Sequence, residues 1–299
     1  MIERIVVPLD GSLTAEAVLP QVRRILHRND SELLLVRAVV PAPAENAILI
    51  ADAASQAARE YVHGVQTRLD REGVRVRSEV RVGSTIGVIL DVVEDWKATM
   101  IAMATHGTTG LKRVLLGSVA EAVLRKSPVP VLVVRPFWSS DEAPSDDVER
   151  RPIRTLLVPV DGSDLSGMVV PAALEFSSLF DPRVLLLRVL EAKKKGEGAR
   201  ELEEAKSHLQ GMAKPFERKG IDTLQIVERG DPVHQILETA RFHEADLIAM
   251  TTHGRSGIGR LVTGSVTEQV LRRSPVPLLV VRAAAPARPK RRALVAKRR

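Results

Sequence analysis

The sequence contains the same set of short motifs twice, in the same order. Residues 5–12 (IVVPLDGS) return as 156–163 (LLVPVDGS), and residues 127–135 (SPVPVLVVR) return as 274–282 (SPVPLLVVR). A repeat this long within 299 residues indicates the tandem duplication of a whole domain, not a short-period solenoid. Each copy is long enough to bury its own hydrophobic core.

The stretch between the two copies is polar, acidic and interrupted by proline, as is typical of a linker. The last residues are rich in Lys and Arg. We therefore expect a first domain over residues 1–136, a linker over 137–152, a second domain over 153–283 and a disordered basic tail over 284–299.

Within the first copy, short β-branched and apolar runs alternate with helical patterns. The predicted strands are 2–9, 32–40, 74–82, 98–103 and 130–135, and the predicted helices are 13–28, 44–72, 84–96 and 117–126. All but the third strand are near-continuous apolar runs, as in parallel strands that are covered on both faces. Such alternation predicts an α/β fold with a doubly wound parallel sheet of five strands in each copy.

The second copy has the same pattern, with one weaker segment. Its predicted strands lie near 153–160, 183–190, 222–229, 246–250 and 277–282. Gly196, Gly198 and Pro215 interrupt the helical pattern near 197–219. This favours a mobile loop followed by a helix in that region.

Composition excludes several classes of protein. The chain has no cysteine, which excludes disulfides, thiol nucleophiles, thiolate metal sites and iron–sulfur clusters. It opens without the basic and apolar segments of a secretory signal. No apolar run approaches the ~20 residues of a membrane-spanning helix. We therefore expect a cytoplasmic protein without a membrane span.

The formal net charge of +7 comes from the end of the chain. Of the 44 Lys and Arg, seven lie in residues 287–299, and the chain has 37 Asp and Glu, so the rest of the chain is neutral. The tail could add salt-dependent affinity for nucleic acid or an anionic membrane. A solvated, disordered terminus is the favoured interpretation, because no aromatic residue accompanies the charge for base stacking.

A glycine-bounded loop follows the fourth predicted strand of each copy. Gly107 and Gly117 are separated by nine residues, as are Gly254 and Gly264, and a serine comes next in both copies, Ser118 and Ser265. Glycines let backbone amides approach an anion, and the start of a helix adds partly positive donors. The spacing therefore indicates a phosphate-binding loop. It is neither a P-loop nor a dinucleotide fingerprint.

The serines after these loops have a second interpretation. Ser118 and Glu121, and likewise Ser265 and Glu268, have the spacing of a capping box, in which both side chains bond amides of their own helix. Capping alone and capping combined with ligand binding both remain open.

An aspartate ends the first strand of each copy. The carboxylate of Asp10 or Asp161 could accept hydrogen bonds from both hydroxyls of a ribose. Alternatively, Asp-Gly-Ser is a strand-to-helix turn in which the aspartate bonds its own backbone. The spacing alone does not separate the two.

Neither a metal site nor a nucleophilic centre is predicted. His106 and His253 precede the loop glycines without further ligands of the right kind nearby, and no serine lies in a nucleophile elbow. General acid–base chemistry by His106 stays open but has no visible partner. Lys112 and Arg255 could reach a terminal phosphate, although solvated surface charge is the commoner role.

Taken together, these motifs resemble universal stress protein domains in tandem. The resemblance rests on the strand ending in Asp-Gly-Ser, on Thr-His-Gly, on the two glycines nine residues apart followed by serine, and on the closing Ser-Pro-Val-Pro-x-Leu-Val-Val-Arg. It implies an adenine-nucleotide α-hydrolase-like sheet with strand order 3-2-1-4-5. It also implies ATP, with Mg²⁺, as the ligand of many members, while other members bind no nucleotide.

The same resemblance implies roles for single residues. Asp10 and Asp161 would hold the ribose, and the backbone of Ala38 and Val189 would bind the adenine edge. The phosphate-binding residues would be Gly107, Gly117, Ser118 and Val119 in the first copy and Gly254, Gly264, Ser265, Val266 and Thr267 in the second.

The sequence departs from the family pattern at one important position. The family's first loop glycine is replaced by Ala104 in one copy and by Thr251 in the other. A β-carbon there could crowd the sugar, and the branched threonine more so. In the second copy Thr267 keeps a hydroxyl for phosphate where the first has Ala120. The motifs do not show which of the two copies is the better nucleotide-binding site.

The family resemblance also implies how the copies meet. The fifth strands, 131–135 and 278–282, are apolar and would be exposed edges in a lone domain, which invites pairing. Pairing them would make the chain a pseudo-twofold dimer, which leaves a further homo-oligomer open.

The leading hypothesis is a stress-response or signalling module that binds an adenine nucleotide, with hydrolysis slow or absent, and acts on an unidentified protein partner. The alternatives are a nucleotide-free interaction protein and a weak ATPase or nucleotidyl-transferring enzyme.

Overall fold

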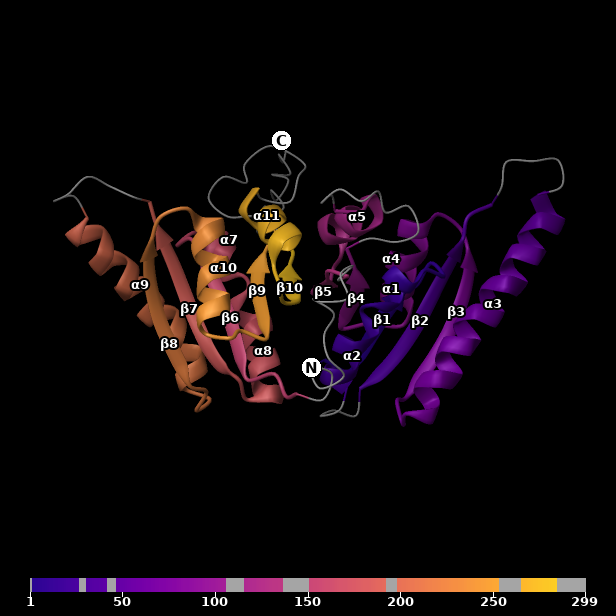
Figure 1. Ribbon diagram of the computed structural model, residues 1–299, viewed down its shortest axis with the longest axis horizontal. Coiled ribbons are helices and arrows are strands. Elements are labelled where there is room, and N and C mark those ends of the chain that lie inside the picture. Colours follow the sequence, from indigo (N-terminus) through magenta and orange to yellow (C-terminus); the bar gives the residue numbers. More distant parts are fainter. Residues whose placement is uncertain are drawn as a thin grey trace, which may run out of the picture.

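The computed structural model describes residues 2–26, 31–41, 47–105, 116–136, 151–191, 198–252 and 265–283. Both halves are built from alternating strands and helices (Figure 1). The elements of the first half are β1 (Arg4–Pro8), α1 (Leu13–Glu16), α2 (Leu19–Leu26), β2 (Glu32–Val39), α3 (Ala47–Arg71), β3 (Val76–Val82), α4 (Thr85–Asp95), β4 (Met100–Ala104), α5 (Ser118–Lys126) and β5 (Val131–Val134). Those of the second half are β6 (Thr155–Val160), α7 (Asp164–Gly167), α8 (Val170–Phe180), β7 (Arg183–Leu190), α9 (Ala199–Glu217), β8 (Thr223–Arg229), α10 (Pro232–Phe242), β9 (Leu247–Thr251), α11 (Ser265–Arg273) and β10 (Leu278–Val281).

The ten strands form a single sheet in the order β3-β2-β1-β4-β5-β10-β9-β6-β7-β8. Within each half the order is 3-2-1-4-5 and every pairing is parallel. The predicted α/β class, the five strands of each copy and their order are therefore confirmed.

The two halves meet through their fifth strands. β5 and β10 pair antiparallel, with Leu279 opposite Leu132 at the centre of the register. This confirms the expected pairing of the two apolar edges, and it makes one continuous sheet out of the two that the repeat predicts. Burying both edges removes unpaired backbone groups that would otherwise invite association with other chains.

Two arginines reinforce this junction almost symmetrically. Just after β5, Arg135 donates from Nη1 to the carbonyl of Arg272 in the last turn of α11 (3.3 Å). After β10, Arg282 donates from Nη1 to the carbonyl of Lys126 at the end of α5 (3.0 Å). Each guanidinium thus meets the partly negative carboxyl end of a helix in the other half.

Helices cover both faces of the sheet (Figure 1). The core on one face packs against α1, α2, α3, α8 and α9, and that on the other against α4, α5, α10 and α11. Aliphatic residues dominate both cores, with Phe176 and Phe216 the largest fully buried side chains. No helix in the described part of the chain is both long and apolar enough to cross a membrane.

One predicted helix is divided in the structure, and another is continuous through a proline. The helix predicted over 13–28 is divided into α1 and α2, which are separated by residues 17 and 18. The helix predicted near 197–219 is confirmed as α9, which continues through Pro215 to Glu217. Pro215 lies in the last turn, where Phe216 is fully buried and Ala213 packs beside it in the same core. Burial of these side chains offsets the loss of the backbone hydrogen bond that a proline cannot donate.

Candidate functional site

The carboxyl ends of β1 and β4 bring the predicted site residues of the first half to one edge of the sheet. β1 lies between β2 and β4, so the strand order reverses there. In doubly wound sheets, ligands bind at this switch point. The turn at Asp10 follows β1, and the helix start at Ser118 follows the loop after β4. β6 and β9 have the same arrangement in the second half.

The Asp-Gly-Ser segments form the predicted turns. Asp10 Oδ1 accepts hydrogen bonds from the Ser12 amide (3.0 Å) and the Ser12 hydroxyl (2.6 Å). The Ser12 Oγ in turn accepts from the Ala15 amide (3.1 Å) and caps α1. The aspartate therefore holds the strand-to-helix turn in position, as the backbone interpretation predicts.

The second half repeats this turn closely. Asp161 Oδ1 accepts from the amide (2.9 Å) and the hydroxyl (2.6 Å) of Ser163. Ser163 Oγ then accepts from the Ser166 amide (3.1 Å) and caps α7. Both carboxylates are therefore placed at the sheet edge before any ligand arrives.

An arginine that the sequence analysis missed lies against each turn. Gly11 has a φ of +87°, and a β-carbon there would overlap the guanidinium of Arg37 on β2. Gly162, with a φ of +79°, has the same relation to Arg188 on β7. Glycine is required at both positions, because the turn needs a positive φ and the guanidinium fills the space of a side chain. A charged residue at the same place in two apolar strands was the signal that could have revealed these arginines.

In the first half this arginine belongs to a polar cluster between α1, β2 and α3. The Arg37 guanidinium lies 5.2 Å from the centroid of the Tyr61 ring. The Tyr61 hydroxyl donates to Glu16 Oε1 (2.9 Å), and Glu16 also pairs with Arg68. Burial, and then the hydrogen bond to the Glu16 carboxylate, raise the pKa of Tyr61 well above its usual value. The cluster holds α1 against α3 behind the Asp10 turn.

The backbone of Ala38 is available on the side of β2 that faces β1. The ladder between these strands ends at Pro8 and Val36, and the Leu9 amide donates to the Val36 carbonyl (2.8 Å). Alternate residues of a parallel strand bond the same neighbour, so the amide and carbonyl of Ala38 point past the end of β1. The described residues give this amide no acceptor. Ala38 thus has the donor and acceptor that recognition of an adenine edge requires.

The start of α5 differs from the predicted capping box. The N-cap residue is Gly117, with no side-chain cap, and its amide donates to the Thr105 carbonyl (2.8 Å). Ser118 is the first helical residue and lies one position too late to cap its own helix. The prediction of a Ser118 cap is therefore wrong. In the described part of the chain, the amides of Ser118, Val119 and Ala120 have no acceptor, as expected in the first turn of a helix.

The start of α11 is tied to its strand by a side chain. The Thr267 hydroxyl is buried and donates to the Thr251 carbonyl at the end of β9 (2.7 Å). The corresponding pair in the first half is Ala104 and Ala120, which are both buried and apolar. The hydroxyl predicted to bind phosphate therefore has an internal partner.

Several predicted residues lie outside the described residues. These are Gly107, Gly254, Gly264, His106, His253, Lys112 and Arg255, together with the side chain of Ser265. Val266 is described as half-buried in the first turn of α11. Among the residues that the structure does describe, no group of three or more His, Asp or Glu is arranged to hold a metal ion.

Comparison with known proteins identifies the family. The model of the universal stress protein family matches residues 1–135 and, again, residues 152–282. The chain belongs to the universal stress protein family. It has two universal stress protein domains in tandem, as the repeated motifs predict.

Some relatives match nearly the whole chain and others match about half of it. The chain is 26% identical over 295 residues to a universal stress protein of Mycolicibacterium smegmatis, which covers 93% of this chain and 96% of that protein. It is 34% identical over 139 residues to a universal stress protein of Methanocaldococcus jannaschii, covering 44% of this chain and 82% of that protein. Among solved structures, a universal stress protein from Archaeoglobus fulgidus matches 95% of this chain and 100% of its own, with a TM-score of 0.75 and 23% identity. This last likeness concerns the fold.

Proposed function

We propose that this universal stress protein binds an adenine nucleotide, ATP with Mg²⁺, at the carboxyl edge of its sheet and acts in the stress response through binding rather than turnover. One observation carries the proposal. Three groups suited to the three parts of a nucleotide lie at the same edge: the Asp10 carboxylate, the Ala38 backbone and the first turn of α5.

Each group matches one part of the ligand. The Asp10 carboxylate accepts hydrogen bonds from ribose hydroxyls, and the Ala38 amide and carbonyl match the acceptor and donor of the adenine edge. The amides at Ser118 and Val119 lie at the partly positive start of a nine-residue helix and suit the phosphates. Gly107 and Gly117 complete the phosphate loop in this proposal. The corresponding residues of the second half are Asp161, Val189, Gly254, Gly264, Ser265, Val266 and Thr267.

The described residues fit Mg²⁺ only as a companion of the phosphates. They contain no cluster of three potential ligands, and Mg²⁺ bound to nucleotides keeps several waters and takes few protein ligands. The metal would neutralise phosphate charge and needs no dedicated protein cage. Asp10 and the α5 amides would orient the nucleotide around it.

Slow or absent hydrolysis follows from the role of the aspartate. Asp10 Oδ1 is committed to two hydrogen bonds with Ser12, which suits a fixed acceptor better than a group that exchanges protons during catalysis. We therefore expect phosphate release to be far slower than nucleotide exchange. Rapid release that the Asp10→Asn change abolishes would instead favour an ATPase.

Calorimetric titration of ATP into the full chain tests the proposal. The variant Asp10→Asn combined with Asp161→Asn keeps an oxygen that can accept from Ser12 and Ser163, so both turns survive while the carboxylate charge and an acceptor are lost. We expect saturable heat for the native chain and at least a tenfold loss of affinity for the variant. Circular dichroism melting serves as the control for folding. Absence of heat up to millimolar ATP contradicts the proposal.

A nucleotide-free interaction protein is the second candidate. It is favoured by the Asp-Gly-Ser turns, because their hydrogen bonds to Ser12 and Ser163 form without a ligand. Nucleotide released by denaturing the freshly purified protein separates the two functions. Release of nucleotide in proportion to protein excludes the nucleotide-free function.

Several sequence-based expectations stay predictions. They are the domain and linker boundaries, the cytoplasmic location, the protein partner, further assembly into a homo-oligomer and the role of the basic tail. Deleting residues 287–299 tests the last of these, because binding to a polyanion through the tail would then be lost.

A further inference from the structure

Exposed apolar side chains lie at the carboxyl ends of neighbouring strands in the first half. Among the described residues, four large apolar side chains are exposed, and three of them follow or end neighbouring strands at their carboxyl side. Leu13 (86% exposed) begins the helix after β1, Val40 (62%) follows β2, and Val82 (56%) ends β3. Val40 and Val82 lie at the ends of adjacent strands, because Val39 and Val82 are opposite each other in the β2–β3 register. We call these three residues the apolar rim.

The second half has charged residues at the matching positions. Leu13 corresponds to Asp164, Val40 to Glu191 and Val82 to Arg229, by their places after β6, after β7 and at the end of β8. A single exposed apolar side chain is ordinary. The two otherwise similar copies therefore differ in apolar and charged character at the proposed ligand site.

Arg229 bridges the edge of the second half. Its Nη1 donates to the Glu191 carbonyl (3.4 Å), and its Nη2 donates to the Gly198 carbonyl (3.1 Å). Glu201 of α9 lies 3.6 Å from Nη1. A β-carbon at Gly198 would overlap the guanidinium, so the arginine packs directly against the residue that precedes α9. Val82 cannot make any of these polar contacts in the first half.

The donor expected to recognise adenine is also engaged in the second half. The β6–β7 ladder continues to the pair Val160–Arg188, one pair beyond the equivalent end of the β1–β2 ladder at Pro8–Val36. The longer register places the Val189 amide at the next rung, opposite the Val160 carbonyl. Ala38, its counterpart, lies beyond the end of its ladder.

We propose that the two halves are functionally unequal: the first half binds the nucleotide, with its apolar rim against the purine ring, and the second half does not. This inference rests on the proposed function and specifies the site. The first edge offers a free amide at Ala38 and apolar contact for the base. The second edge has its amide engaged at Val189, a bridging guanidinium at Arg229 and the hydroxyl of Thr267 bonded internally.

The number of nucleotides bound per chain tests this inference. Titration calorimetry and native mass spectrometry of the full chain with ATP are expected to give one nucleotide per chain. The single change Asp10→Asn is expected to weaken this binding at least tenfold and to leave no second site of native affinity. Two sites of similar affinity, or native affinity at one site after Asp10→Asn, overturn the inference while leaving the proposed function intact. No binding by the native chain overturns both.

A matched pair of rim variants tests the apolar contact. Leu13→Asp gives the first half the residue found in the second, and Asp164→Leu makes the reverse change. Both positions begin short helices, and Leu13 is largely exposed, so each protein should fold; melting curves check this. We expect ATP affinity to fall about tenfold for Leu13→Asp, through lost apolar contact and added repulsion of phosphate, and to stay unchanged for Asp164→Leu. Equal effects of the two changes, or none from Leu13→Asp, contradict the assignment.

Discussion

Arg24 of the first half and Asp246 of the second form an ion pair across the two halves, with Arg24 Nη2 2.8 Å from Asp246 Oδ1. The Arg24 side chain is only 4% exposed, and its Nε donates to the Arg151 carbonyl (3.0 Å). Asp246 Oδ2 accepts from the amides of Arg154 (2.8 Å) and Thr155 (3.1 Å). One arginine on α2 thus fastens the first half to the start of the second, away from the strand junction.

Thr99 has the equivalent position in the first half and provides a matched replacement. Its Oγ1 accepts from the amides of Glu3 (3.0 Å) and Arg4 (3.1 Å), so a threonine supports a strand start as the aspartate does. We expect Asp246→Thr to lower the free energy of unfolding by about 2 kcal/mol, because it leaves Arg24 buried without its counterion.

The double variant Arg24→Met with Asp246→Thr separates pairing from burial. It removes the buried, unpaired guanidinium charge and keeps the aliphatic volume of the side chain, so it should recover most of the lost stability. Urea unfolding of both single variants and the double variant measures the coupling. A coupling energy under about 0.5 kcal/mol, as is usual for exposed pairs, would show that the pair does not fasten the halves.

The turn glycines provide a second prediction. Gly11→Ala should destabilise the chain by about 2 kcal/mol, because it adds the penalty of a positive φ to overlap with Arg37. Gly162→Ala should cost more, because Arg188 is buried. Gly64→Ala is the control: this exposed glycine lies within α3 with open space around it, and alanine should stabilise the helix by about 0.5–1 kcal/mol. Thermal melting of the three variants would contradict the account if Gly11→Ala matched Gly64→Ala.

The raised pKa of Tyr61 leads to a prediction about folding stability at alkaline pH. Its pKa is raised in the folded state, so above the ordinary value of 10.0 the unfolded chain loses this proton before the folded chain does. Folding stability from this group is therefore complete below about pH 10 and is lost as the pH rises further. Tyr61→Phe should flatten the alkaline fall in unfolding free energy.

The phenol can be titrated directly because Tyr61 is the only tyrosine of the chain. Tyrosinate absorbance should develop well above pH 10 in the native protein and at lower pH in Glu16→Gln, which removes the carboxylate that raises the pKa. An ordinary tyrosine titration in the native protein would contradict the proposed cluster.

The duplicated motifs predicted the fold because each local signal agreed with the global arrangement. Apolar strands alternating with helices require a covered parallel sheet, and two apolar edges require pairing, as Leu132 and Leu279 show. The helical pattern near Pro215 is weak in sequence yet α9 continues through it, because the burial of Phe216 is a tertiary effect that no local helix rule contains.

The site was predictable in outline and not in its differences between halves. The position of Asp10 at the end of a strand follows from pattern alone. Whether a strand ladder ends at Val36 or continues to Arg188 depends on the register between distant segments. The sequence motifs do not contain this information. Arg24 and Asp246 are 222 residues apart, and no spacing rule connects them.

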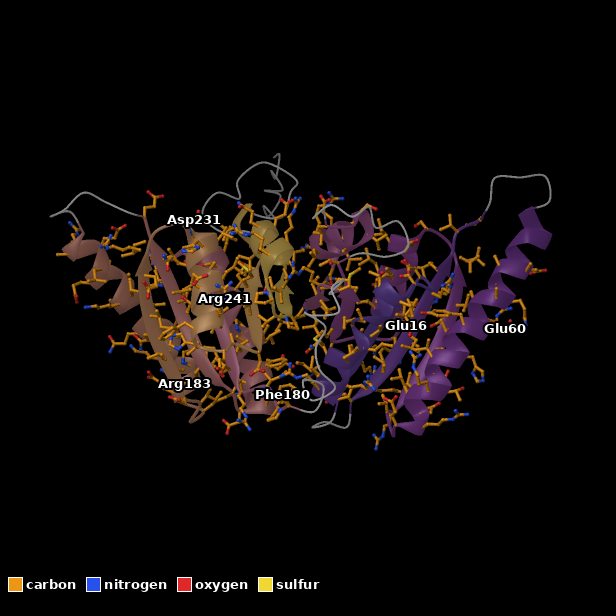
Figure 2. All side chains as sticks on the ribbon, viewed as in Figure 1. Glu16, Glu60, Phe180, Arg183, Asp231 and Arg241 are labelled. Atoms are coloured by element: carbon orange, nitrogen blue, oxygen red, sulfur yellow. The ribbon has the colours of Figure 1, made fainter. Side chains whose placement is uncertain are left out.

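Hydrogen–deuterium exchange of the full chain with and without ATP tests the central claim most directly, because it locates the ligand. The account predicts slower exchange with ATP in peptides that contain the Asp10 turn, Ala38 and the start of α5 at Ser118, and little change around Asp161 and Val189. Figure 2 shows Asp231, which follows β8, and Arg183, which begins β7, at opposite ends of the strands in the second half. Peptides around Arg183 therefore lie away from the carboxyl ends of the strands and serve as the unaffected reference. Unchanged exchange at Asp10, Ala38 and Ser118 under saturating ATP would contradict the claim.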